Sequence, residues 1–133
     1  MKLKRIGTLK MTIKFLFALI LTLLLSNLCG AETGTASWYG NESICWKWGG
    51  HTRNGEMFEE SKLTCAMPNK SQLNKWYKVT NLKNNKSVIV WANDTGSFAK
   101  YGRIIDLSKA SFKKICPLEK GLCKVKIEIY QRR

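Results

Sequence analysis

The sequence predicts an all-β (mainly β) domain, a small closed barrel of six strands with one short helix. Short strand-like segments alternate with turns, no segment repeats, and one stretch has helical start and stop signals. A closed barrel is favoured because it leaves no long strand edge exposed outside the cell. The strand candidates are Thr35–Tyr39, Leu63–Met67, Trp76–Asn81, Ser87–Ala92, Arg103–Leu107 and Lys124–Tyr130.

The third and fourth segments carry the strongest local signal. They flank the stretch Leu82-Lys83-Asn84-Asn85-Lys86, and its Asn pair tolerates the left-handed backbone that a hairpin loop often requires. We therefore expect Trp76–Asn81 and Ser87–Ala92 to form an antiparallel hairpin.

A helix is expected to follow the fifth strand. Ser108 can cap it, Lys109–Ile115 carry it and Pro117 stops it. The final strand, Lys124–Tyr130, alternates apolar with charged residues, which is typical of a strand with one buried face.

Residues 1–31 are predicted to be a secretory signal peptide, which leaves a barrel domain at 32–133. A basic leader precedes the apolar run Phe15–Leu25, and Cys29 and Ala31 supply small residues for cleavage before Glu32. The apolar run is shorter than the roughly 20 residues of a membrane-spanning helix. We expect a secreted, periplasmic or wall-associated protein. Lipid attachment at Cys29 is the alternative, disfavoured because Leu28 stands where a small residue is expected.

The exported chain remains strongly basic, with 18 Lys and Arg against nine acidic residues, a net charge of about +9. Outside the cytoplasm the available polyanions are wall polymers, anionic lipids and polysaccharides, so nucleic acid is not an expected partner. The alternative is that the charge reflects the general abundance of lysine. We expect a monomer.

Four cysteines remain after export, and an even number in a small exported domain predicts two disulfides. The expected pairs are Cys45 with Cys65 and Cys116 with Cys123, because each pair brackets one local segment. Closing a loop of about 20 residues contributes roughly 3 kcal/mol. Zinc binding is disfavoured, since the chain has no C-x-x-C motif and His51 is its only histidine.

Carboxylates are the remaining candidates for chemistry, because no Gly-rich phosphate loop and no G-x-S-x-G motif is present. Glu56 lies in a polar glycine turn, and Asp94 follows the apolar strand that ends at Ala92. One protonated and one ionised carboxyl can cleave a glycosidic bond, and no cofactor or metal is needed. The alternative is that both acids bond the backbone of their own turns.

Six short motifs follow one another along the chain. They are Thr35-Ala36-Ser37-Trp38-Tyr39-Gly40, Thr52-Arg53-Asn54-Gly55-Glu56-Met57-Phe58, Leu63-Thr64-Cys65-Ala66, Lys78-Val79-Thr80-Asn81-Leu82, Asn93-Asp94 and Gly102-Arg103-Ile104-Ile105-Asp106-Leu107-Ser108. In this order and spacing, from about Gly34 to Tyr130, the chain resembles the RlpA (rare lipoprotein A) family. This resemblance implies a six-stranded double-psi β-barrel, a fold shared with expansins and barwin-like proteins. It also implies lytic transglycosylase activity on peptidoglycan strands that lack stem peptides.

The resemblance places the family's catalytic acids on Glu56 and Asp94. We expect Glu56 to protonate the oxygen between N-acetylmuramic acid and N-acetylglucosamine. Ionised Asp94 would stabilise the oxocarbenium-like charge, or take the proton of the muramyl 6-hydroxyl as a 1,6-anhydro ring closes. The expected substrate-binding residues are Tyr39, Asn54, Asn93 and Trp46.

The chain departs from the family pattern at several positions. Met67 replaces a groove histidine and Thr95 replaces an arginine, while the segment Ser71–Lys75 is altered. His51 could stand in for the missing imidazole. Asp106 is expected to bond backbone near the helix start rather than to do chemistry.

Trp46 and Trp48 lie in an insert, Asn41–Gly50, where they either stack on sugars or pack beside Cys45 over one end of the barrel.

Two other functions stay open beside the enzyme. The domain as a whole could be a non-catalytic, expansin-like or barwin-like wall-binding protein. A secreted defence or effector protein on the same barrel is a third possibility.

Overall fold

The computed structural model describes residues 10, 12–21, 30–44 and 49–133. The chain divides into two compact units, Met1–Gly30 and Ala31–Arg133. In the first unit residues 12–21 are helical. Among the described residues, no helix has the length and apolar character needed to span a membrane.

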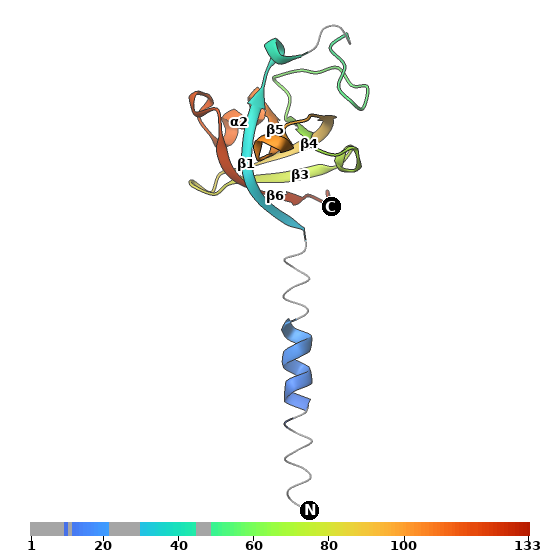
Figure 1. The fold of residues 1–133 in the computed structure, drawn as a ribbon, viewed down its shortest axis with the longest axis vertical. Helices are drawn as coiled ribbons and strands as arrows, with labels where there is room; N and C mark the ends of the chain where they lie inside the picture. The colour runs from blue at the N-terminus through green and yellow to red at the C-terminus, as the bar shows by residue number, and fades with distance from the viewer. Residues whose placement is uncertain (1–9, 11, 22–29, 45–48) are drawn as a thin grey trace, which may run out of the picture. The chain divides into compact units, whose positions relative to one another are not determined.

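The second unit is a closed barrel in the order β1-β5-β2-β4-β3-β6, which confirms the predicted six-stranded fold (Figure 1). β1 pairs with β5 and β2 with β4 in parallel, and the other neighbours are antiparallel. Parallel pairs in so small a barrel require long crossing connections, in agreement with the double-psi topology. The strands are β1 Ala31–Tyr39, β2 Thr64–Met67, β3 Trp76–Asn81, β4 Ser87–Thr95, β5 Arg103–Ser108 and β6 Cys123–Ile129.

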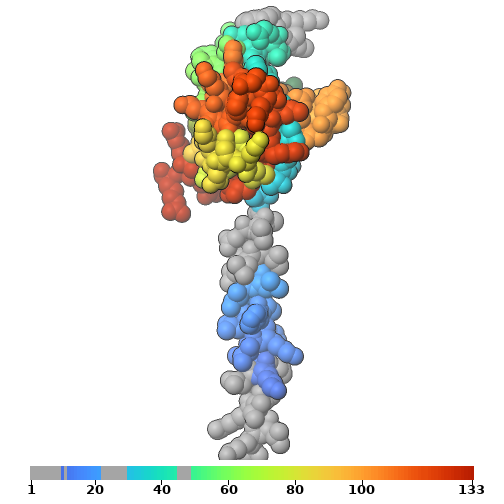
Figure 2. Space-filling view, turned by 90° about the vertical axis from the view of Figure 1, so that its left-hand side faces the viewer, coloured from blue at the N-terminus to red at the C-terminus, as the bar shows by residue number. Residues whose placement is uncertain are grey.

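The predicted β3–β4 hairpin is confirmed, with Lys78 opposite Ile89. Asn85 adopts φ 62°, the left-handed conformation that its residue type tolerates. Asn84 in the same loop donates from Nδ2 to the carbonyl of Ile115 at 3.0 Å. Figure 2 shows this loop in yellow beside the orange-red segment that contains Ile115. The loop is therefore fixed to Ile115, the last residue of the helix that follows β5.

Helix α2, Lys109–Ile115, has the predicted boundaries. It buries Phe112 and Ile115 against the barrel, and the Phe112 ring lies 6.4 Å from that of Trp38. The remaining helical turns are the short 3-10 segments η1 Asn41–Ser43, η3 Lys70–Gln72, η4 Ala99–Tyr101 and η5 Leu118–Lys120.

Ser108 caps α2 and also joins it to the turn just before β2. Its Oγ accepts from the Ser111 amide at 3.3 Å and donates to the Lys62 carbonyl at 2.6 Å. We expect Ser108→Ala to lower the free energy of unfolding by about 1–2 kcal/mol, because a cap and a buried bond are lost together. Urea denaturation measures this, and exposed Ser87→Ala is the matched control. Equal stability of the two variants would contradict the assigned role.

The cysteines only partly follow the prediction. Cys116 and Cys123 form the expected disulfide. The expected Cys45–Cys65 pairing is wrong: Cys65 is a free thiol, fully buried in the core beside residues such as Leu107, and Cys45 lies outside the described residues. An inward-facing position on a barrel strand is filled by packing, and a cysteine there behaves as a small hydrophobic residue.

A β-bulge near the end of β4 changes which side chains of this strand face outward. Cys65 pairs with Ala92, but the next residue of β2, Ala66, pairs with Asp94, so Asn93 is an extra residue on β4. A bulge changes which face the following side chains occupy. Asn93 is consequently buried at 2% exposure, and Asp94 reaches the outer surface of the barrel.

Candidate active site

A row of side chains crosses four neighbouring strands on the outside of the barrel. Ser37 pairs with Asp106, and Ala66 pairs with both Asp106 and Asp94. The two carboxyls therefore flank one small side chain, whose size leaves space between them. They line a cleft of about 340 Å³, together with Tyr39, Ser43, Ile44, His51, Ala66, Thr95 and Gly96.

Asp94 is a half-buried carboxyl at the tip of β4. Its Oδ1 accepts hydrogen bonds from the amides of Arg53 at 3.0 Å and Thr95 at 2.9 Å. Burial raises the pKa of Asp94 above its ordinary value, and the two backbone donors offset only part of this effect. Asp94 therefore holds its proton to higher pH than an exposed aspartate does.

Tyr39 closes one side of the cleft. Its ring stacks on Phe58 with centroids 4.7 Å apart, and the residue is 8% exposed. Burial, followed by the charge of Asp94, raises the pKa of Tyr39, so its hydroxyl stays protonated. The predicted substrate-binding role of Tyr39 remains a prediction, supported by its place in the cleft wall.

Asp106 does not bond the helix start as expected. Its Oδ1 accepts from Ser37 Oγ at 2.9 Å, and Arg103 donates to the same Oγ at 2.8 Å. Burial raises the pKa of Asp106, and the charge of Asp94 adds to the rise. The alternation of β5 could have revealed this position, because Ile105 and Leu107 face the core and Asp106 must face outward.

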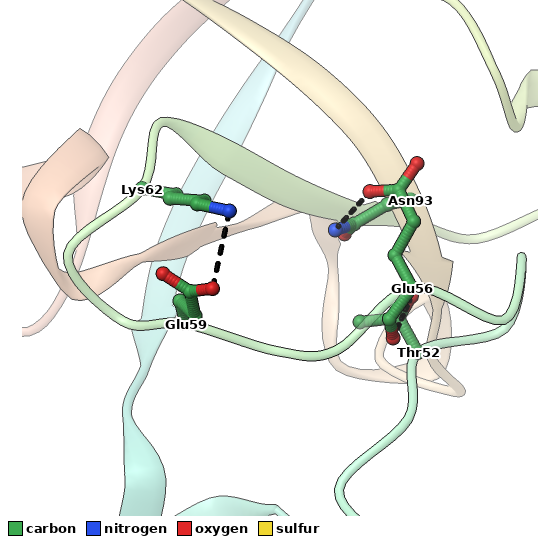
Figure 3. Close-up of polar contacts among 5 residues, drawn as sticks. All are labelled: Thr52, Glu56, Glu59, Lys62 and Asn93. Carbon is green, nitrogen blue, oxygen red and sulfur yellow. Dashed lines mark hydrogen bonds and ion pairs between the residues drawn. The ribbon is translucent and has the colours of Figure 1, made fainter.

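Glu56 lies on a loop that is fixed to the end of β4. Its Oε1 accepts from Asn54 Nδ2 at 2.8 Å and from Trp91 Nε1 at 3.0 Å, and its Oε2 accepts from Asn93 Nδ2 at 3.3 Å (Figure 3). The Trp91 bond, aided by both amides, lowers the pKa of Glu56 despite partial desolvation. Glu56 is therefore an exposed, ionised carboxylate.

These pKa directions favour the opposite assignment of the two roles predicted for the acids. The desolvated carboxyl is Asp94, which suits a proton donor, and the carboxylate held in its charged form is Glu56. Sequence reasoning missed this because Trp91, the donor that lowers the pKa of Glu56 most, lies on β4, far along the chain from the Glu56 loop.

The loop that carries Glu56 also bonds Asp94, so one loop connects the two acids. The two carboxyls do not, however, line the same cleft. The Arg53 amide donates to Asp94, and the Asn54 amide donates to the Asn93 carbonyl at 3.0 Å. A second cleft, of about 380 Å³, is lined by residues 51–53 together with Asp94 and Thr95. Glu56 is not among the described residues that line either cleft.

Other predicted site residues are placed differently from expectation. Asn93 is buried and Asn54 is half-buried, and both hold Glu56 in position rather than presenting free amides to a substrate. Met67 is fully buried in the core, so its side chain is not a groove group. His51 lines both clefts, and its Nδ1 lies 3.1 Å from the Gly55 carbonyl oxygen. Trp46 and Trp48 lie outside the described residues.

Removal of the Trp91 donor tests its control of Glu56. We expect Trp91→Phe to raise the pKa of Glu56 toward the ordinary value for glutamate, because the largest stabilisation of its charge is lost. A carbon-13 NMR titration of the carboxyl group measures the shift. Trp76→Phe removes an indole donor from the neighbouring strand and serves as the control. If the titration midpoint of Glu56 is unchanged in Trp91→Phe, the Trp91 hydrogen bond does not set the pKa of Glu56.

The described residues hold no group of three or more His, Cys, Asp or Glu side chains that could bind a metal ion. A family model described as lytic transglycolase (DPBB_1) matches residues 31–127. The chain belongs to the RlpA-like double-psi β-barrel family. Asp94 and Glu56 are the residues that the resemblance predicts to be catalytic, and their catalytic roles stay a prediction.

Curated relatives of this RlpA-like domain include two proteins named endolytic peptidoglycan transglycosylase RlpA. The one from Rickettsia bellii is 46% identical over 97 residues, covering 73% of this chain and 41% of the relative. The one from Vibrio cholerae is 42% identical over 99 residues, covering 74% and 35%. The chain thus spans about two fifths of the length of these relatives.

Solved structures show the same fold at low sequence identity. The Streptomyces papain inhibitor has a TM-score of 0.61 at 19% identity, over 77% of this chain and 96% of the inhibitor. The expansin of Clavibacter michiganensis has a TM-score of 0.60 at 15% identity, over 77% of this chain and 52% of the expansin.

Proposed function

We propose that this RlpA-like domain is an endolytic peptidoglycan lytic transglycosylase. It cleaves bonds between N-acetylmuramic acid and N-acetylglucosamine in peptide-free glycan strands and leaves 1,6-anhydro ends. The observation that carries the proposal is that one loop bonds the end of β4 at two carboxyls: Asp94, whose pKa is raised, lies in an open cleft, and Glu56 is held ionised by its donors. The names and 41–46% identity of the curated relatives support it.

The reaction uses Asp94 twice. Its proton passes to the glycosidic oxygen as the bond to the muramyl C1 breaks, and the electron pair of that bond stays on the leaving oxygen. The muramyl 6-hydroxyl then attacks C1, and its proton returns to the Asp94 carboxylate. The negative charge of Glu56 stabilises the oxocarbenium-like state between the two steps. Water is not consumed, so protons and charge balance within the enzyme and the sugar.

Product analysis tests this function directly. Peptide-free glycan strands are incubated with the purified domain, and new ends are identified by mass spectrometry. The expected product carries a 1,6-anhydromuramyl end, which is lighter by one water molecule than a hydrolysed end. Reducing muramyl ends would show a hydrolase and would refute the proposed ring closure.

The pKa directions also predict a bell-shaped pH profile of kcat/KM. The rate should rise as pH increases through the lowered pKa of Glu56, which must be ionised. It should fall as pH increases through the raised pKa of Asp94, which must be protonated. Initial rates measured from pH 3 to 9 would contradict these roles if they rose continuously to the alkaline end.

A binding protein without cleavage is the second candidate. It is favoured by the absence of Glu56 from the described walls of the two clefts. In this case Asp94 and Asp106 hold wall polysaccharide, as an expansin of the same fold holds cellohexaose in a solved complex. Retention on wall material with no new ends by mass spectrometry would support this candidate.

We also propose that residues 1–31 direct export and that the barrel acts outside the cytoplasm as a monomer. β1 begins at Ala31, which pairs with Glu128, so cleavage before Glu32 removes only the first residue of the strand. The mass of the protein recovered from the cell envelope checks the cleavage point, and a lipid on Cys29 would appear as added mass.

A further inference from the structure

Two tryptophans form an aromatic pair on the barrel surface. Trp76 on β3 lies directly opposite Trp91 on β4, with ring centroids 5.1 Å apart and planes inclined by 48°. Both side chains are partly exposed, and neither belongs to the two clusters that form the core. Burial in the core therefore does not account for this pair.

The pair is in contact with the loop that carries Glu56. Trp91 donates from its indole to Glu56, and Asn54 bridges from Glu56 to the side chain of Asn74 at 3.0 Å. A ligand that lies on the indole rings would therefore pass beside the Glu56 carboxylate.

A cation completes this surface. The Arg132 guanidinium lies 5.2 Å from the ring centroid of Trp76, and Arg132 is exposed. An exposed guanidinium on a long, flexible side chain can leave the ring to pair with a carboxylate of a ligand, which frees the ring for an apolar surface. Trp76 and Arg132 together thus offer one apolar face and one positive charge.

We infer that Trp76, Trp91 and Arg132 form a glycan subsite that recognises a muramyl residue without its stem peptide. The apolar C–H face of a pyranose packs on the indoles. When the stem peptide is absent, the lactyl group of the muramyl residue ends in a free carboxylate, which pairs with Arg132. This inference rests on the proposed function for the identity of the glycan. It assigns the subsite to the Glu56 side of the loop.

Binding to two ligands tests the inference. One is a peptide-free peptidoglycan oligosaccharide, kept intact by an Asp94→Asn background, and the other is the hexamer of N-acetylglucosamine, which has no lactyl carboxylate. We expect Trp76→Ala to weaken binding of both ligands about tenfold, because the stacking face is lost. Arg132→Gln should weaken only the peptidoglycan ligand, by about two- to fivefold at low salt. Leu122→Ala, an exposed change beside the disulfide, is the control.

Indole N–H signals in two-dimensional NMR add a readout of position. Those of Trp76 and Trp91 are expected to shift with either ligand. The inference is overturned if neither indole shifts, or if Trp76→Ala binds both ligands as tightly as the parent protein. Equal weakening of both ligands by Arg132→Gln would overturn the recognition of the lactyl carboxylate.

Failure of the subsite and failure of the proposed function give different results. If the unaltered domain forms 1,6-anhydro ends and Trp76→Ala leaves KM unchanged, the subsite is wrong and the function stands. If the unaltered domain forms no new ends but Trp76→Ala still weakens binding, the transglycosylase proposal is wrong and the subsite stands.

Discussion

Asp94→Asn should abolish formation of 1,6-anhydro ends, with a loss of at least about 100-fold in kcat, the lower range for removal of a general acid. The amide has no proton to give to the leaving oxygen and cannot take the proton of the attacking hydroxyl. Substrate affinity should change much less, because the amide keeps nearly the same shape. The measurement is the initial rate of new ends by mass spectrometry.

The same substitution should leave the barrel folded. An asparagine Oδ1 can still accept the two backbone hydrogen bonds that Asp94 accepts from Arg53 and Thr95. Glu128→Gln is the matched control, since it makes the same change in an exposed ion pair on β6. Full activity of Asp94→Asn, with an unchanged unfolding temperature, would exclude Asp94 as the acid.

Most of the fold could be predicted because local patterns and tertiary structure agree. β3 and α2 have the predicted boundaries, since strand alternation, a serine cap and a following proline act within a few residues. β1 and β4 are longer than predicted. β1 begins at Ala31, the expected last residue of the leader, and β4 continues to Thr95 through the bulge at Asn93.

The catalytic roles of the two acids stay a prediction, whereas the structure bears directly on their protonation states. Asp94 could be found because it follows a buried strand, and burial does raise its pKa. The state of Glu56 depends on Trp91, which lies 35 residues away and approaches only when β4 is placed beside the loop. Contacts of this kind are set by strand order, which a period-two pattern does not encode.

The prediction for Cys65 failed for a related reason. An even number of cysteines indicates an oxidising compartment. Whether Cys65 forms a disulfide depends instead on the face of β2 on which it lies. Met67 lies on the same inward face, two residues further along the strand. The small outward residue between them, Ala66, is the one that contacts the cleft.

Glu56→Gln is expected to reduce kcat by about 10²–10³-fold, the usual cost of removing one preorganised electrostatic group at a reacting centre. The glutamine Oε1 can still accept from Trp91 and Asn54, so the side chain should keep its place while losing its charge. The acid limb of the pH profile should disappear with it, because Glu56 is the group whose ionisation sets that limb.

Glu59→Gln is the matched control for this substitution. Glu59 lies three residues further along the chain and pairs with Lys62 at 3.1 Å, on the surface and separate from Asn93 (Figure 3). Removing an exposed ion pair of this kind changes stability by at most about 1 kcal/mol, so activity should be retained. If both variants kept full activity, the charge of Glu56 would have no part in the reaction, and the loop would serve only to fix the amide of Arg53 against Asp94. A loss confined to Glu56→Gln would mean that the negative charge, which the Trp91 indole holds in place, acts on the reacting sugar.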